Sequence, residues 1–167
     1  MYLFTPNTLI KSNEINANFA ESILSTSHKN SYMFFVCRSA AWNMGNNAAA
    51  HLAFDSINYD IGGCYDTGLG RFTAPVSGYY WLFAQMTANT ISGAGMYAAI
   101  YKNGTEYVLG DYKVPVGYTG GFGTSVSVAV TSYFNAGQYA SIYSYGANNT
   151  GHTGGKATRF EGRFISK

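Results

Sequence analysis

Few residues of this chain have the types and spacing that catalysis or metal binding requires. His28, His51 and His152 are its three histidines, and they lie far apart, none beside an acidic residue at ligand spacing. We therefore expect no metal site at the histidines, and expect His51 to be an ordinary residue at the start of a strand. No GxSxG, HExxH, Walker or GxGxxG pattern occurs in the sequence. These observations predict a non-enzymatic protein that needs no cofactor.

The carboxylates offer one further candidate for chemistry. The chain has only eight of them, and Asp55, Asp60 and Asp66 lie close together in sequence. Carboxylates grouped in this way could form a weak cation site or an acid pair. With so few carboxylates, we regard a hydrolase acting on cell-wall sugars as the weakest of the functional hypotheses.

Composition excludes several other classes of protein. Only 11% of residues are charged, against about 25% in an average soluble protein. Aromatic residues reach 17% and the net charge is +2, which excludes disorder and offers no basic face for nucleic acid. No run of 18 apolar residues predicts a membrane span. The N-terminus has no signal-peptide pattern, which indicates action in the cytosol or export by another route.

The two cysteines, Cys37 and Cys64, form neither a disulfide framework nor a CxxC metal pattern. We expect both to be small buried residues, since free cysteine is among the most buried residue types. Their spacing alone does not determine whether they pair.

The first 31 residues differ from the rest of the chain. Ile15, Phe19 and Ile23 recur every fourth residue after a possible capping residue, Ser12, which predicts a short helix with one apolar stripe. Residues 25–31 then form a polar linker. In isolation this helix would be only marginally stable, so it must pack against a partner. The residues of this segment that we expect to contact that partner are Ile10, Ile15, Phe19, Ile23 and Leu24.

From Tyr32 onward the hydrophobic period changes to two. Runs rich in Val, Ile, Tyr, Phe and Thr alternate with Gly, Asn and Ser clusters, and Asn103-Gly104 predicts a two-residue hairpin turn. About nine strands without an internal helix indicate an all-β sandwich or jelly roll. The expected strands are 32–39, 51–55, 69–74, 78–88, 95–102, 106–109, 123–132, 139–145 and 158–166.

Six ordered pieces of residues 32–167 resemble the globular head of the q subunit of the first complement component. The most specific piece runs from Tyr65-Asp66 through Gly70-Arg71-Phe72 to Ala74-Pro75 and Gly78-Tyr79-Tyr80-Trp81-Leu82-Phe83. The other pieces are Phe35-Val36-Cys37-Arg38, Leu52-Ala53-Phe54-Asp55, Ala99 to Gly104, Ser125 to Ala140 and Phe160 to Ile165. The motif residues are Phe35, Phe54, Tyr65, Phe72, Pro75, Gly78, Tyr80, Phe83, Asn103, Gly104, Gly137, Phe160 and Gly162.

This resemblance implies a ten-stranded TNF-like jelly-roll sandwich of two five-stranded antiparallel sheets, assembled as a homotrimer. It places Asp55 and Asp66 at strand ends, which favours turn and capping roles for them. The turn at Asn135–Gln138 has Gln138 where the family usually has an acid, which argues against calcium there. Among the aromatic residues, we assign Phe54, Phe72, Phe83 and Phe164 to the sandwich core.

Residues 7–19 carry a second resemblance. Asn7 to Phe19, with the stretch Ile10-Lys11-Ser12-Asn13-Glu14-Ile15-Asn16-Ala17-Asn18-Phe19, is similar to a segment near the N-termini of bacteriophage tail-fibre and virion proteins. It implies a virion-anchoring segment at 1–31 and a projecting head at 32–167. The location it implies is the virion surface, after synthesis in the bacterial cytoplasm, with other virion proteins (tail, baseplate or capsid) as partners.

The long connections between strands are the candidate receptor contacts. They are rich in Gly, Asn, Thr and Tyr, a composition typical of recognition loops, although such loops can equally serve tight turns. A glycan or protein on the host surface is the expected ligand, and neither nucleic acid nor membrane insertion is expected. Three roles remain open: a tail-fibre tip, a capsid head fibre or decoration, and a soluble lectin-like module. The candidate contact residues are Trp42, Asn46, Tyr112, Tyr118, Phe122, Asn148 and His152.

Overall fold

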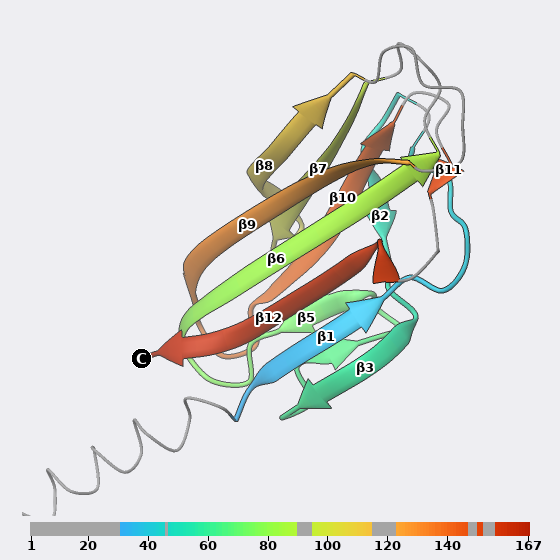
Figure 1. Cartoon of the computed structure of the whole chain (residues 1–167). Coiled ribbons are helices and arrows are strands. Elements are labelled where there is room, and N and C mark those ends of the chain that lie inside the picture. Colours follow the sequence, from blue (N-terminus) through green and yellow to red (C-terminus); the bar gives the residue numbers. More distant parts are fainter. Residues whose placement is uncertain (1–30, 46, 90–94, 115–122, 147–149, 152–155) are drawn as a thin grey trace, which may run out of the picture.

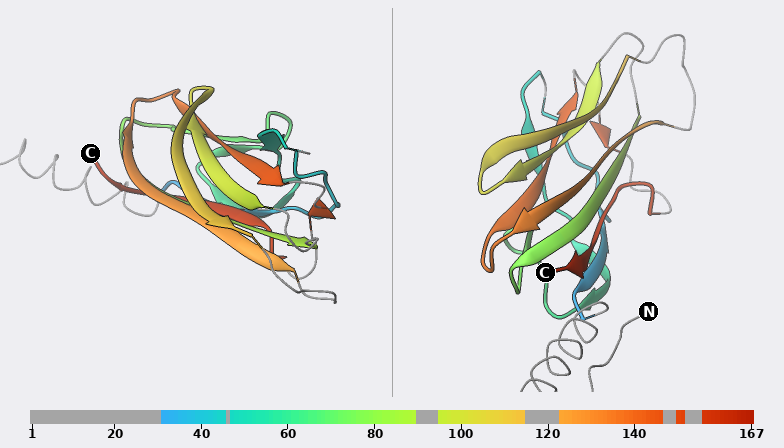
Figure 2. Two further views of the ribbon diagram at one scale, coloured as in Figure 1. Left: turned by 90° about the horizontal axis from the view of Figure 1, so that it is seen from above. Right: turned by 90° about the vertical axis from the view of Figure 1, so that its left-hand side faces the viewer.

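Two antiparallel β-sheets lie face to face in the computed structural model of the chain (Figures 1 and 2). The structure describes residues 31–45, 47–89, 95–114, 123–146, 150–151 and 156–167. Within these ranges the regular elements are strands with short turns, and no helix has the length and apolarity that a membrane span requires. The expected N-terminal helix, with Ile10, Ile15, Phe19, Ile23 and Leu24, falls outside the described residues.

The first sheet has β6 at its centre, between β9 on one side and β12 on the other, followed by β1 and β3. The short β11 also pairs with β6. The strands of the first sheet are β1 (Met33–Cys37), β3 (Ser56–Ile61), β6 (Gly78–Asn89), β9 (Thr124–Phe134), β11 (Thr150–Gly151) and β12 (Arg159–Ser166).

The second sheet is built around β10, which pairs with β7 on one side and with β5 and β2 on the other. β8 extends the sheet beyond β7, and β4 extends it beyond β5. The strands of the second sheet are β2 (Ala50–Leu52), β4 (Tyr65–Asp66), β5 (Arg71–Thr73), β7 (Met96–Lys102), β8 (Thr105–Lys113) and β10 (Tyr139–Gly146).

The expected jelly-roll class is confirmed. The described residues form twelve strands where ten were expected, and the difference is two very short strands. The ten strands of three or more residues divide into five per sheet, and β4 and β11 add only two residues each. The β3 strand was not expected, because Ser56–Ile61 lies mostly exposed at the sheet edge and has no clear alternation. β8 runs to Lys113, whereas the sequence predicted a connection from Gly110.

The core lies between the two sheets and is filled by inward-facing side chains. In β9, the alternation of Val126 and Val128 with exposed partners places one face inward, as expected from the sequence. Glycine is required on the inner face of β12: a Cβ on Gly162 would lie 2.6 Å from both Leu82 and the Phe34 ring, its neighbours in the same sheet. The largest fully buried side chains are Phe34, Met44, Leu52, Phe54, Phe72, Tyr80, Leu82, Met86, Met96, Ile100, Phe134 and Phe160.

The expected hairpin turn between β7 and β8 is confirmed. Asn103 and Gly104 have φ angles of 51° and 84°, and positive values at both central residues define a type I′ turn. Asn103 also accepts a hydrogen bond from the Tyr139 backbone N–H at 3.0 Å. The turn therefore fixes the β7–β8 register and ties it to the start of β10.

Candidate functional site

The three aspartates serve turns and loops. Asp60 accepts hydrogen bonds from the Cys64 and Tyr65 backbone N–H groups at 2.7 and 3.1 Å, and Asp66 accepts one from Leu69 at 2.9 Å. Within the described residues no three His, Cys, Asp or Glu side chains converge as a metal-binding group. The aspartates therefore have the turn and capping roles that the sequence favoured.

Asp55 lies after β2 and contacts the residues that follow β1. Its carboxylate accepts a hydrogen bond from the Ser39 N–H at 2.7 Å and lies 3.3 Å from the Arg38 guanidinium. Desolvation is the largest influence and raises its pKa, but the hydrogen bonds from Ser39 and the charge of Arg38 outweigh it and lower the pKa overall. The carboxylate is thus held ionised as a structural partner.

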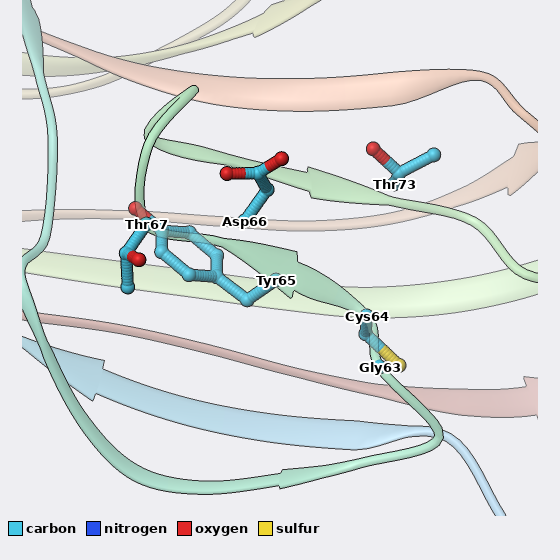
Figure 3. A pocket seen from close by; sticks show the side chains of 6 residues that line it. All are labelled: Gly63, Cys64, Tyr65, Asp66, Thr67 and Thr73. Carbon is cyan, nitrogen blue, oxygen red and sulfur yellow. The ribbon is translucent and has the colours of Figure 1, made fainter.

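A polar hollow lies beside β4 and β5 (Figure 3). It encloses about 480 Å³, and Figure 3 shows the Thr67, Thr73 and Asp66 side chains around it. Cys64 lies at its edge with a thiol whose pKa burial raises to about 12, so a thiolate nucleophile is not available there. The lining residues are Gly63, Cys64, Tyr65, Asp66, Thr67 and Thr73.

Both cysteines are buried, as expected, and both are free. The Cys37 sulfur accepts a hydrogen bond from the Asn58 amide at 3.1 Å, and the Cys64 thiol donates to the Ile61 carbonyl at 3.3 Å. They have separate partners on β3, at the edge of the first sheet.

His51 lies where the sequence placed it, in the short β2 strand. Its Nε2 is 3.1 Å from the Gly70 carbonyl oxygen, and its ring lies 5.4 Å from the ring of Tyr143. Both contacts suit a structural role at an exposed sheet position.

Two of the candidate receptor residues lie within the described part of the chain. Trp42 is half-buried and packs against the core, and its buried Nε1 has no hydrogen-bond partner within the described part of the chain. Tyr112 lies on β8 and not in a loop, because β8 continues to pair with β7 through Met96 and Lys113. The remaining candidates, Asn46, Tyr118, Phe122, Asn148 and His152, fall outside the described residues.

The outer face of the first sheet carries a broad aromatic surface. Trp81 and Phe83 project outward from β6 with their rings stacked at 5.9 Å and 8°, and Phe35 projects from β1. All three are half-buried. The assignment of Phe83 to the core is therefore wrong, whereas Phe54, Phe72 and Phe164 are core residues. The error has a simple cause, since aromatic side chains occupy both faces of residues 79–83.

Three cationic side chains lie over the faces of these rings. The Arg163 guanidinium lies 5.4 Å from the Trp81 ring, and the Arg159 guanidinium lies 5.4 Å from the Phe83 ring. The Lys156 ammonium lies 5.5 Å from the Phe35 ring, within the range of a cation–π contact. We call these six residues (Phe35, Trp81, Phe83, Lys156, Arg159 and Arg163) the aromatic–basic face.

Sequence reasoning missed the basic part of this surface. The signal was present as alternation in 159–163, where Arg159, Glu161 and Arg163 share one face of β12. This surface also has a small depression of about 120 Å³ between Tyr59, Trp81 and Arg163. Aromatic and arginine side chains together are typical of the centre of a protein–protein interface.

Comparison with known proteins agrees with this architecture. Residues 33–115 match a family model described as the C1q domain, just under half of the chain. The globular domain of zebrafish complement 1qA has a similar structure, with a TM-score of 0.60, 14% identity, and 81% of this chain and 98% of that chain covered. This protein has the C1q/TNF-like jelly-roll fold.

TNF-type structures superpose equally well on this jelly roll. Murine APRIL matches with a TM-score of 0.60, 9% identity, and 80% of this chain and 98% of that chain covered. Eiger TNF from S. frugiperda matches with a TM-score of 0.62, 8% identity, and 83% and 94% covered. No curated protein matches the sequence significantly. At these identities the structures establish the fold, and the function has to be argued from the surfaces of this chain.

Proposed function

We propose that this protein is a non-enzymatic virion structural protein of a bacteriophage, a trimeric fibre or fibre-tip protein. Its N-terminal segment anchors it to the particle, and its C1q/TNF-like head projects outward to meet the host surface. The two settings are a tail fibre that attaches to the host and a capsid head fibre or decoration. The location proposed is the virion surface.

The aromatic–basic face is the observation that supports the trimer most strongly. Trp81, Phe83 and Phe35 remain half-buried in the single chain, so a second copy could still cover them. Charged residues are rare in this chain, and three of its ten Lys and Arg side chains lie over these rings. Burial of such a face between copies of the chain would stabilise a homotrimer.

The virion role rests on the resemblance of residues 7–19 to the N-termini of phage structural proteins. A short apolar stripe at Ile15, Phe19 and Ile23 is suited to docking against a larger particle. Charge is scarce in the chain as a whole, and a protein held in an assembly depends less on the solubility of the single chain.

Deleting residues 1–24 tests the anchor. Phage produced with the shortened protein should lack it after purification, as judged by immunoblot of the particles, while the head accumulates free in the lysate. A Tyr107→Phe variant of the full chain is the control, and it should remain on particles. Retention of the shortened protein on purified virions would contradict an N-terminal anchor.

A soluble lectin-like module is the second candidate function. It is favoured by a surface of tyrosine side chains on the second sheet, described below, which does not depend on attachment to a particle. The same immunoblot separates the two roles, because a lectin-like module would be absent from purified particles with or without residues 1–24.

A further inference from the structure

The outer face of the second sheet is a layer of tyrosine side chains. Tyr97 and Tyr101 project from β7, and Tyr139, Tyr143 and Tyr145 project from β10, all with the same parity in the paired register. All five are half-buried. We call these five residues the tyrosine face. Figure 1 shows β7 and β10 side by side in this sheet, which packs against the sheet of β6, β9 and β12.

The rings of this face are stacked in cross-strand pairs. The Tyr101 and Tyr143 centroids are 3.8 Å apart with the planes at 22°, and those of Tyr97 and Tyr145 are 4.9 Å apart at 3°. Tyr97 and Tyr145 are directly opposite each other in the register, whereas Tyr101 and Tyr143 are diagonal neighbours. Both pairs stack across the boundary between β7 and β10.

The hydroxyl groups are available as hydrogen-bonding groups. Tyr101 donates to the Glu106 carboxylate at 3.3 Å and Tyr145 to the Asn47 amide oxygen at 3.3 Å. Each phenolic oxygen retains acceptor capacity after donating its proton. Burial, followed by the nearby charge of Glu106, raises the pKa of both Tyr97 and Tyr101, so these phenols stay protonated at physiological pH.

The tyrosine face is bordered by one residue of each charge. The Arg71 guanidinium lies 4.1 Å over the Tyr139 ring, and the Glu106 carboxylate accepts a hydrogen bond from the Tyr101 hydroxyl. The small residues Ala99 and Ser141 are buried between the rings. The aromatic–basic face carries three cations, of which Arg159 pairs with Glu161 at 3.4 Å, and its rings have no hydroxyl groups.

We propose that the tyrosine face binds a neutral polysaccharide built of pyranose sugars. A pyranose presents apolar C–H groups and a ring of hydroxyl groups, which suit half-buried aromatic rings and phenolic oxygens that accept hydrogen bonds. The Glu106 carboxylate beside Tyr101 would repel an anionic polymer, and the Arg71 guanidinium is stacked on the Tyr139 ring. This inference names the class of ligand that the head binds. It rests on the proposed function only in placing that ligand on the host surface.

Affinity electrophoresis of the full chain tests the proposal. The protein is run through native gels containing mannan, dextran, galactan or galactomannan, with an anionic alginate gel for comparison. We expect at least one neutral polysaccharide to retard the protein and alginate not to retard it. A Y101A/Y143A variant should bind about tenfold more weakly, equivalent to about 1.4 kcal/mol.

Matched variants keep the test interpretable. Y79A/Y133A removes another cross-strand tyrosine pair, at 5.3 Å, from the first sheet, and should leave the retardation unchanged. Y143F keeps the ring stack but loses a hydroxyl, so it should bind with intermediate affinity and guards against misfolding of the double alanine variant. Circular dichroism confirms that each variant is folded.

Three results would overturn the proposal: no retardation by any neutral polysaccharide, equal loss in Y101A/Y143A and Y79A/Y133A, or retardation by alginate alone. A change of molar mass in Y101A/Y143A would also overturn it, because the face would then be a contact between copies. A trimer that binds no polysaccharide contradicts this inference alone. A monomer that binds one contradicts the proposed assembly and leaves the inference standing.

Discussion

Single aromatic residues of this protein serve three different environments. Phe72 and Phe160 fill the core, Trp81 and Phe83 lie under arginines on the first sheet, and Tyr143 stacks on the second. The high aromatic content of the chain therefore does not describe one oversized core. It supplies a packed interior and two outer faces of different chemistry.

Gly162 leaves room on the inner face of the first sheet for the side chains of Phe34 and Leu82. Gly162→Ala places a methyl group 2.6 Å from Leu82 and Phe34, so we expect a loss of about 2 kcal/mol in the free energy of unfolding. Urea denaturation followed by fluorescence measures it. Gly68→Ala is the control, since its Cβ would meet only the Asp66 carboxylate at 3.3 Å, and its stability should change little. Equal stability of the two variants would contradict the packing described for β12.

Asp55 should make stability depend on pH. Its pKa is lowered in the folded state from the ordinary value of 3.8, so its contribution is present above about pH 4 and is lost as the pH falls further. Because the carboxylate is partly exposed, Asp55→Asn should cost only about 0.5 kcal/mol at pH 7. Thermal melts at pH 7 and pH 3 measure the difference, which should be smaller at pH 3. A deficit of equal size at both pH values would exclude this role.

At the scale of elements, the β7–β8 hairpin depends on its turn. Gly104 has a φ of 84°, so Gly104→Ala should destabilise the protein by about 1 kcal/mol. Asn103→Gly is the comparison: it tolerates the positive φ but loses the hydrogen bond from Tyr139. Denaturation midpoints of both variants test whether strain or the lost hydrogen bond dominates. Unchanged stability in Gly104→Ala would show that the turn is not type I′ in solution.

The two edge strands β8 and β9 close one side of the sandwich. The Lys102 and Lys113 ammonium groups donate to the Tyr133 and Ser125 carbonyls at 2.7 and 2.8 Å, and the Tyr107 hydroxyl lies 2.9 Å from that of Ser132. Edge strands with free backbone groups invite aggregation, and lysines that occupy those carbonyls reduce the risk.

Strands were predictable from sequence where one face is buried, and less so at the edges. The alternation in 125–131 identified β9, whereas β3 escaped notice because Ser56–Ile61 has almost no buried face. The end of β8 was also missed, since its pairing with β7 passes through a register shift that sequence does not reveal. Resemblance to a known family supplied the topology, which periodicity alone does not define.

The candidate site was harder to predict than the fold. Phe35 and Phe83 belong to the family motif, but whether they point inward depends on strand register and not on residue type. The tyrosine face escaped notice for the same reason, because its members come from two strands more than 35 residues apart. Of the predicted contact residues, Trp42 is held against the core and Tyr112 lies on a strand.

At the scale of the whole molecule, the jelly roll presents its two outer faces in opposite directions. Covering the aromatic–basic face in an assembly would leave the tyrosine face available outside it. This division assigns assembly to the first sheet and recognition to the second.

Substitution of Phe83 tests the assembly face without touching the core. Phe83→Ser should weaken self-association by about 2 kcal/mol per interface, because it removes a ring at the centre of the aromatic–basic face. Sedimentation velocity at several concentrations measures the shift toward smaller species. Tyr143→Ser, on the opposite face, should sediment as the unmodified protein does; if it dissociates and Phe83→Ser does not, the assignment of the two faces is reversed.

The molar mass of the unmodified full chain tests the central claim most directly. Sedimentation equilibrium at micromolar concentration should give about 54 kDa, three times the 18.1 kDa of one chain. A trimer of this mass is the result expected if the aromatic–basic face is buried between copies. A single species of 18.1 kDa across the concentration range would contradict the trimeric head.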